Sequence, residues 1–178
     1  GNRSAKRIPL GEPDPASLEF GKTVKTAEAF RVNIASILDS TVAQQTPVVL
    51  MTFAFHLPVD YSRDAFLQQG LSYGEGFFRI PVESWGPAEG VAAAVAAHNR
   101  EIRDLAERRE DVVFVDQHKR LSHEGHLFSD VCHLTDAGIE TFVDGLVQTL
   151  LDNEAAVGLK LAPAGELERN PERRTGDR

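Results

Sequence analysis

The 178-residue sequence has a single cysteine, which excludes an internal disulfide and leaves the redox compartment open. It has no run of 18 apolar residues, so it offers no segment for a membrane-spanning helix. Basic residues are fewer than acidic ones: the sequence has 19 Lys and Arg and 27 Asp and Glu, which gives a net charge of −8. Nucleic acids and anionic membranes select clustered Lys and Arg, so we expect neither as a partner.

The start of the chain has neither an initiator methionine nor the apolar segment of a signal peptide. We therefore expect the sequence to begin inside a larger protein, or after processing, and it does not indicate a cellular location or an oligomeric state. The composition, 42% hydrophobic and 26% charged, is that of a globular domain. We expect one domain over residues 1–158 and a disordered tail over 159–178, where charge, Pro and Gly dominate.

Hydrophobic periodicity predicts three amphipathic helices and two buried strands. The helices are expected over 23–43, from Pro87 onward, and after Thr135, which is a good N-cap. The strands are expected over 48–53 and 112–115, where apolar character is continuous, as in a parallel sheet covered on both faces. The apolar stripes are Phe30, Ile34, Ile37 and Leu38 in the first helix, Val91, Val95, His98, Ile102 and Leu105 in the second, and Ile139, Phe142, Val143, Leu146, Val147, Leu150 and Leu151 in the third.

Asp130 and His133 stand three residues apart in a short non-helical segment that leads into the third helix. A single turn suffices to bring this carboxylate and imidazole together. In a Ser-His-Asp triad the carboxylate holds the histidine through its Nδ1–H, and Nε2 is left free to take the serine proton. The spacing therefore predicts two of the three parts of a catalytic triad.

The segment Asp130-Val131-Cys132-His133-Leu134-Thr135, followed by Gly138, resembles the last conserved block of the SGNH hydrolases, also called GDSL-type esterases and lipases. The order of strands and helices over residues 1–153 is similar as well. The resemblance implies a three-layer α/β/α sandwich with a parallel, flavodoxin-like sheet. It implies hydrolysis of a small acyl ester, with His133 as general base, Asp130 as its orienting carboxylate, and no metal or cofactor.

The Gly-Asp-Ser block that supplies the nucleophile in that family is absent from this sequence. The resemblance places it N-terminal to everything present, so we expect an N-terminally truncated domain that is inactive by itself. Gly1-Asn2 could be the end of the family's G-x-N block, in which case Asn2 would help to bind the oxyanion. The family usually has Asp after this asparagine, and here it is Arg3, so an exposed terminal loop is the alternative interpretation.

Residues 54–86 show no clear periodicity, and a loop of this length is usually functional or mobile. Eight of the thirteen aromatic residues lie between Phe53 and Trp85. This density predicts a substrate flap over an apolar pocket, although the rings could equally cap the sheet. The flap residues we expect are Phe55, Tyr61, Tyr73, Phe77 and Trp85.

Gly70-Leu71-Ser72-Tyr73-Gly74 satisfies the G-x-S-x-G pattern of the nucleophile elbow in another hydrolase fold. That pattern has its mechanical meaning only between a strand and a helix. A short helix or loop precedes it here, and we do not expect Ser72 to be a nucleophile.

Two alternatives to a serine hydrolase remain open. His118, His123 and His126 could belong to a metal-dependent hydrolase, although their spacing is not a recognisable zinc signature. A non-catalytic binding module of the same fold would follow if the full-length protein lacked a nucleophile. Cys132 is expected to be a small buried residue, and His98 a core histidine with a hydrogen-bond partner.

Overall fold

The computed structural model describes residues 12–154. The helices are α1 (Pro15–Phe20), α2 (Ala27–Ala43), α3 (Arg63–Leu67), α4 (Ala88–Glu107), α5 (Gln117–Leu121) and α6 (Asp136–Asp152), with 3-10 turns η1 (Val82–Ser84) and η2 (Gly125–Leu127). The strands are β1 (Val48–Met51) and β2 (Val112–Val115). Thr135 caps α6 as predicted, since its hydroxyl accepts a hydrogen bond from the Gly138 amide.

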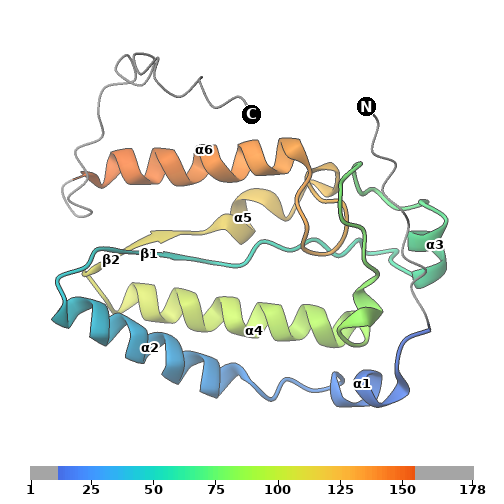
Figure 1. Ribbon diagram of the computed structural model, residues 1–178, viewed down its shortest axis with the longest axis horizontal. Helices are drawn as coiled ribbons and strands as arrows, with labels where there is room; N and C mark the ends of the chain where they lie inside the picture. The colour runs from blue at the N-terminus through green and yellow to red at the C-terminus, as the bar shows by residue number, and fades with distance from the viewer. Residues whose placement is uncertain (1–11, 155–178) are drawn as a thin grey trace, which may run out of the picture.

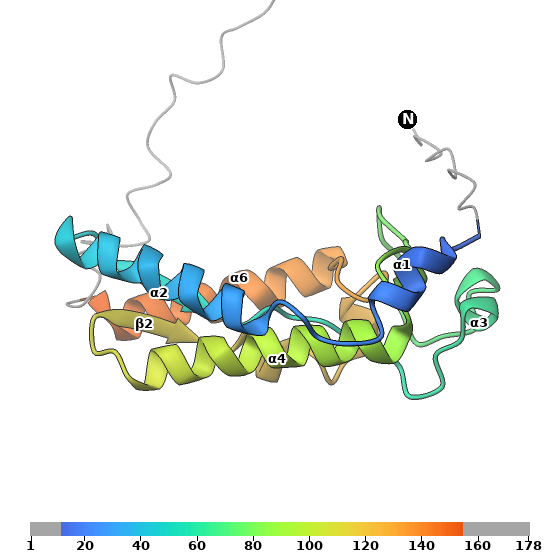
Figure 2. The ribbon, with the colours of Figure 1, turned by 90° about the horizontal axis from the view of Figure 1, so that it is seen from below.

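The two strands pair in parallel, in a register that runs from Val48 opposite Val112 to Met51 opposite Val115. Helix α6 lies on one side of them, and α2 and α4 lie on the other (Figure 1). Seen from below, α2 and α4 run alongside each other across the strands (Figure 2). The described chain is therefore an α/β structure with a two-stranded parallel sheet, which agrees with the α/β part of the predicted fold class.

Among residues 12–154 the hydrophobic core has two parts. The first lies between the strands and the α2 and α4 helices, and it is centred on Leu38, Leu50 and Ile102. The second lies beyond the strands, where the loop after β1 meets the segment before α6. Its buried residues are Ala54, Phe66, Leu71, Tyr73, Leu121, Leu127 and Phe128.

Two short helices were not predicted. Helix α1 begins after its N-cap, Asp14, whose carboxylate accepts hydrogen bonds from the amides of Ala16 and Ser17. Helix α5 begins in the same way, since the Asp116 carboxylate caps the amide of Lys119. Helices of five or six residues bury too few apolar side chains to produce a periodic pattern, so the capping residue is their signal in the sequence.

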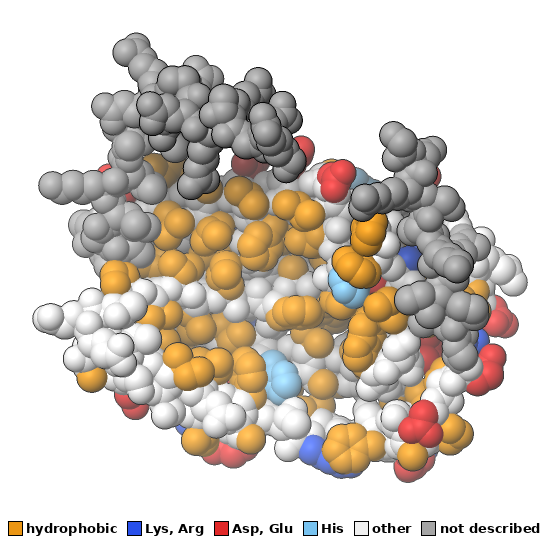
Figure 3. All heavy atoms as spheres, in the orientation of Figure 1, with side chains coloured by type: hydrophobic (Ala, Val, Ile, Leu, Met, Phe, Trp, Pro, Cys, Tyr) orange, Lys and Arg blue, Asp and Glu red, His pale blue; other side chains and the backbone are white. Residues whose placement is uncertain are grey.

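The apolar stripe predicted for α6 is only partly covered within the described residues. Phe142, Leu146 and Leu150 are half-buried. Ile139, Val143, Val147 and Leu151 are exposed. Figure 3 shows hydrophobic side chains gathered along α6 and below it, over the same face as the strands. Half of the predicted stripe is therefore left uncovered by residues 12–154.

The predicted domain boundary at residue 158 and the predicted tail lie outside the described residues. Between residues 12 and 154, no helix combines the length and the apolar character needed to cross a membrane.

Candidate functional site

The segment from Phe128 to Thr135 is a closed loop beyond the carboxyl ends of the strands (Figure 1). Phe128 and Leu134 form an antiparallel bridge at its base. Inside it, the Ser129 amide donates to the carbonyl oxygen of His133 at 2.8 Å. Parallel sheets in open α/β folds carry their ligands at this edge.

Asp130 is completely buried, and its carboxylate is held from several directions. Oδ1 accepts hydrogen bonds from the amides of Cys132 at 3.0 Å and His133 at 2.9 Å. Oδ2 accepts one from the amide of Ile80 at 2.7 Å, from a different part of the chain. These main-chain donors fix the carboxylate and compensate for the water that burial removes.

The His133 ring meets this carboxylate, as the spacing predicted. Nδ1 lies 2.9 Å from Oδ1 and 2.8 Å from Oδ2 of Asp130. Since an ionised carboxylate only accepts, Nδ1 carries the proton in the neutral ring, and Nε2 has the free lone pair. The His133 side chain is 33% exposed, and Nε2 has no hydrogen-bond partner among residues 12–154. His133 Nε2 is therefore a base open to solvent, on a ring that the buried Asp130 carboxylate holds in place.

The aromatic residues of the predicted flap divide into two groups. Tyr61 and Tyr73 belong to the second core, and the Tyr73 hydroxyl donates to the carbonyl oxygen of His56. Phe55 stacks on the ring of His118 at 4.7 Å. These three rings are packed against the body of the protein, so the alternative of capping rings describes them better.

Phe77 and Trp85 remain at the surface, as a substrate flap requires. Their neighbour Phe78, which was not among the expected flap residues, lies closest to the site, with its ring 5.1 Å from that of His133. A pair of consecutive phenylalanines signals an apolar surface, but only the fold shows which ring reaches the histidine.

Cys132 lies beside the pair, with Sγ 3.7 Å from His133 Nδ1. The pKa of the Cys132 thiol is raised to about 11, mainly by burial and secondly by the charge of the neighbouring Asp130 carboxylate. The thiol is therefore protonated at neutral pH and is a poor nucleophile. Cys132 is half-buried, so the prediction of a small buried side chain holds only in part.

The ligand atoms of Asp130, Cys132 and His133 lie within 4.8 Å of one another, which is the one such group found among residues 12–154. Both carboxylate oxygens are already occupied by amide and imidazole donors. A metal ion would have to displace the hydrogen bond between Nδ1 and the carboxylate. The geometry fits an acid–base pair better than a metal centre.

The three histidines of the metal alternative do not meet. His118 stacks on Phe55, and its Nδ1 lies 2.6 Å from the Ser122 hydroxyl. Burial, followed by the nearby Arg103, lowers the pKa of His118. His126 is at the surface beside Glu124, with 3.7 Å between Nε2 and the carboxylate. Within residues 12–154, His118, His123 and His126 form no group with metal-ligand spacing.

The other sequence candidates lie as follows. Ser72 is exposed in a segment without helix or strand, after α3 and before another coil, so the geometry of a nucleophile elbow is missing, as expected. His98 bonds to the Thr26 hydroxyl at 2.9 Å and stacks on Phe30, which confirms the predicted partnered histidine. Asn2 lies outside the described residues, so its predicted role in binding the oxyanion stays a prediction.

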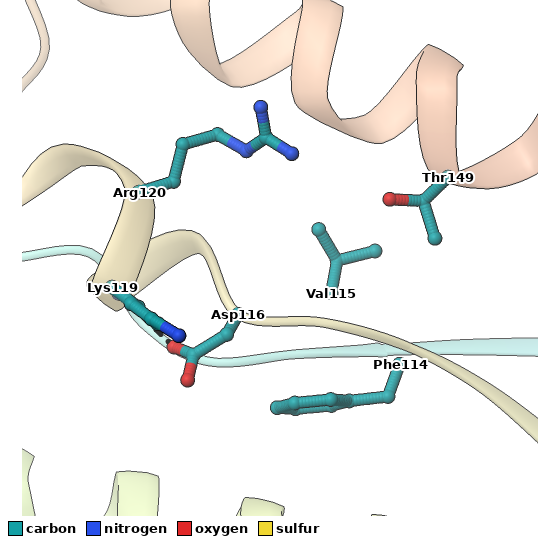
Figure 4. A pocket seen from close by; sticks show the side chains of 6 residues that line it. All are labelled: Phe114, Val115, Asp116, Lys119, Arg120 and Thr149. Atoms are coloured by element: carbon teal, nitrogen blue, oxygen red, sulfur yellow. Dashed lines mark hydrogen bonds between the residues drawn. The ribbon is translucent and has the colours of Figure 1, made fainter.

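A hollow of about 370 Å³ lies between β2, α5 and α6. Its lining comprises Phe114, Val115, Asp116, Lys119, Arg120 and Thr149 (Figure 4). Asp116 is already engaged there, because it accepts two hydrogen bonds from Arg103 and one from the Thr52 hydroxyl. Neither Asp130 nor His133 lines this hollow, and no nucleophile–base pair faces it, so it is not the candidate site.

The chain matches no protein-family model, no curated protein and no solved structure. The case for a function therefore depends on the residues themselves.

Proposed function

We propose that the chain carries the acid–base half of a serine hydrolase of the SGNH type, which acts on acyl esters. In this proposal the strands and helices belong to a three-layer α/β/α sandwich. The nucleophilic serine comes from residues outside the 178. The observation that carries the proposal is the fully buried Asp130 carboxylate bonded to His133 Nδ1.

In this proposal each partner has a role. His133 Nε2 takes the proton of the serine hydroxyl as its oxygen attacks the ester carbonyl, and returns that proton to the leaving alcohol. The same nitrogen then activates a water that releases the acyl group. Asp130 remains ionised, holds the ring and stabilises the imidazolium that forms in each step. Its three main-chain donors keep it in place throughout.

Two further features support the proposal. The pair lies beyond the carboxyl ends of parallel strands, where α/β folds carry their ligands (Figure 1). It also stands immediately before the α6 N-cap, so the loop is anchored on a long helix and not on a mobile segment. Both are properties of the fold and do not depend on the resemblance in sequence.

The test compares the 178-residue chain with a longer chain that includes an upstream Gly-Asp-Ser block. We expect the 178 residues alone to hydrolyse p-nitrophenyl acetate no faster than their His133→Ala variant. In the longer chain, His133→Ala should abolish nearly all turnover, and Asp130→Asn should lower kcat by up to about 10⁴-fold.

Ser72→Ala is the matched control in both chains and should change little. If the 178-residue chain showed turnover that disappeared in the Ser72→Ala variant, Ser72 would be the nucleophile and the proposal would be refuted. Equal turnover of the longer chain and its His133→Ala variant would refute it as well.

A further inference from the structure

Two consecutive phenylalanine rings stand exposed beside the candidate base. Phe77 is 78% exposed and Phe78 is 54% exposed. The rings contact each other edge to face, with centroids 5.2 Å apart, and the Phe78 ring is tilted against that of His133 at 5.1 Å. A phenylalanine ring that faces water is unfavourable, since its burial removes apolar surface from water.

The segment that carries these rings is fixed to the loop of His133. The Ser129 hydroxyl donates to the carbonyl oxygen of Phe78 at 2.5 Å, and the Ile80 amide donates to Asp130 at 2.7 Å. Gly76 permits the close approach, because a Cβ at this position would overlap the side chain of Ser129. The rings are therefore held at a set position relative to the imidazole of His133.

We propose that Phe77 and Phe78 form the subsite for the apolar part of the ester, next to the bond that His133 helps to cleave. This proposal rests on the proposed function, and it names the substrate class: esters with an aliphatic or aryl group of several carbons on one side. An apolar group laid on the rings removes both surfaces from water. An ester with only short, polar substituents leaves the rings exposed to water, so the rings contribute nothing to its binding.

The apolar group can belong to the acyl chain or to the alcohol, since either places a hydrocarbon beside the carbonyl. Methyl hexanoate, hexyl acetate and methyl acetate separate the two sources. We would titrate each into the 178-residue chain and follow the His133 ring and the Ile80 amide by NMR. Binding is read without turnover, so the result does not depend on a nucleophile.

We expect saturable shifts with methyl hexanoate or hexyl acetate at concentrations where methyl acetate gives none. The variant Phe77→Ser with Phe78→Ser should bind about tenfold more weakly or worse. Phe77→Tyr with Phe78→Tyr keeps the rings and should retain most of the binding. Phe20→Ser is the matched control, since Phe20 on α1 is 65% exposed, between the values of Phe77 and Phe78.

Equal shifts with methyl acetate, or binding that survives the double serine substitution, would overturn the subsite. If none of the three esters binds, the subsite is overturned as well, and the rings are then a contact surface for protein. Failure of the hydrolase proposal gives a different pattern, in which the esters bind through the rings but the longer chain shows no turnover that depends on His133.

Discussion

The main-chain amide of Ile80 donates a 2.7 Å hydrogen bond to Oδ2 of Asp130, across fifty residues of sequence. This bond joins the segment before η1 to the loop before α6, and it supplies a donor that the loop of Asp130 does not contain. Because Oδ2 also receives His133 Nδ1, the position of the aromatic segment and the orientation of the imidazole are set by one carboxylate. The two parts of the site should therefore respond together to substitution.

The tautomer of His133 is the first consequence that can be measured. With Asp130 as acceptor, the neutral ring should carry its proton on Nδ1, and ¹⁵N NMR at pH 8 should show Nε2 unprotonated. Asp130→Asn offers an amide that can also donate, so both tautomers should then appear. A wild-type ring protonated on Nε2 would contradict the assigned hydrogen bond. His98, which bonds to Thr26 through Nε2, serves as the internal reference.

Gly76→Ala should separate the aromatic segment from the site. Its Cβ would overlap the side chain of buried Ser129, so the segment must move or the protein must lose about 1–3 kcal/mol of stability. We expect a lower Tm and loss of the nuclear Overhauser contacts between Phe78 and His133. Gly70→Ala is the control, because its Cβ would meet only the Ala65 carbonyl oxygen, at an ordinary 3.6 Å. Equal effects of the two substitutions would show that the contact with Ser129 is unimportant.

The sequence was sufficient for those features that depend on near neighbours. The contact between Asp130 and His133 needs only one turn, and the two strands follow from short runs of apolar, β-branched residues. The bond from Ile80 could not be predicted, since a main-chain amide has no sequence signature. Nor could the packing of the aromatic residues, because Tyr73 and Phe78 lie in the same aperiodic loop, yet Tyr73 is buried in the second core and Phe78 stays exposed. Composition identified the apolar loop, and tertiary packing decided which rings remain available.

The reactivity of Cys132 provides a test of its environment. Burial, with the Asp130 carboxylate as the next cause, raises the pKa of this thiol to about 11, so little thiolate exists at pH 8. We expect iodoacetamide to alkylate it far more slowly than a free cysteine at pH 8, with a rate that rises until about pH 11. In 6 M guanidinium chloride the difference should vanish. Rapid alkylation of the folded chain at pH 7 would show that the thiol is activated.

Asp116 should contribute to stability in a defined pH range. Burial alone would raise its pKa, but hydrogen bonds from Arg103, the Lys119 amide and Thr52 outweigh it and hold the pKa at about 2, below the usual 3.8. A folded pKa below the unfolded one gives stability that is complete above about pH 4 and is lost as the pH falls through 2. After allowance for solvent screening, the contribution is about 1 kcal/mol.

Urea unfolding of Asp116→Asn should therefore show reduced stability at pH 7 and a smaller loss between pH 4 and pH 2 than the parent chain. Asp60→Asn, at an exposed turn residue, is the control and should change neither value. A variant that loses stability in acid as steeply as the parent would show that Asp116 is not the group that titrates.

The exposed half of α6 leads to the last prediction. Ile139, Val143, Val147 and Leu151 are exposed on this helix, spaced four residues apart, and nothing among residues 12–154 covers them. Figure 3 shows hydrophobic side chains gathered along α6 and below it. Contiguous apolar surface of this kind favours association, so the purified 178-residue chain should bind ANS and self-associate. Val143→Gln with Val147→Gln should lower both ANS fluorescence and the apparent mass in sedimentation, while the free energy of unfolding changes by less than about 1 kcal/mol.

The control is Leu121→Ala, at a fully buried position of the second core, which should instead lower the free energy of unfolding by about 2–5 kcal/mol. A monomer that binds no ANS and unfolds in one sharp transition, before and after the double substitution, would show that this face is covered.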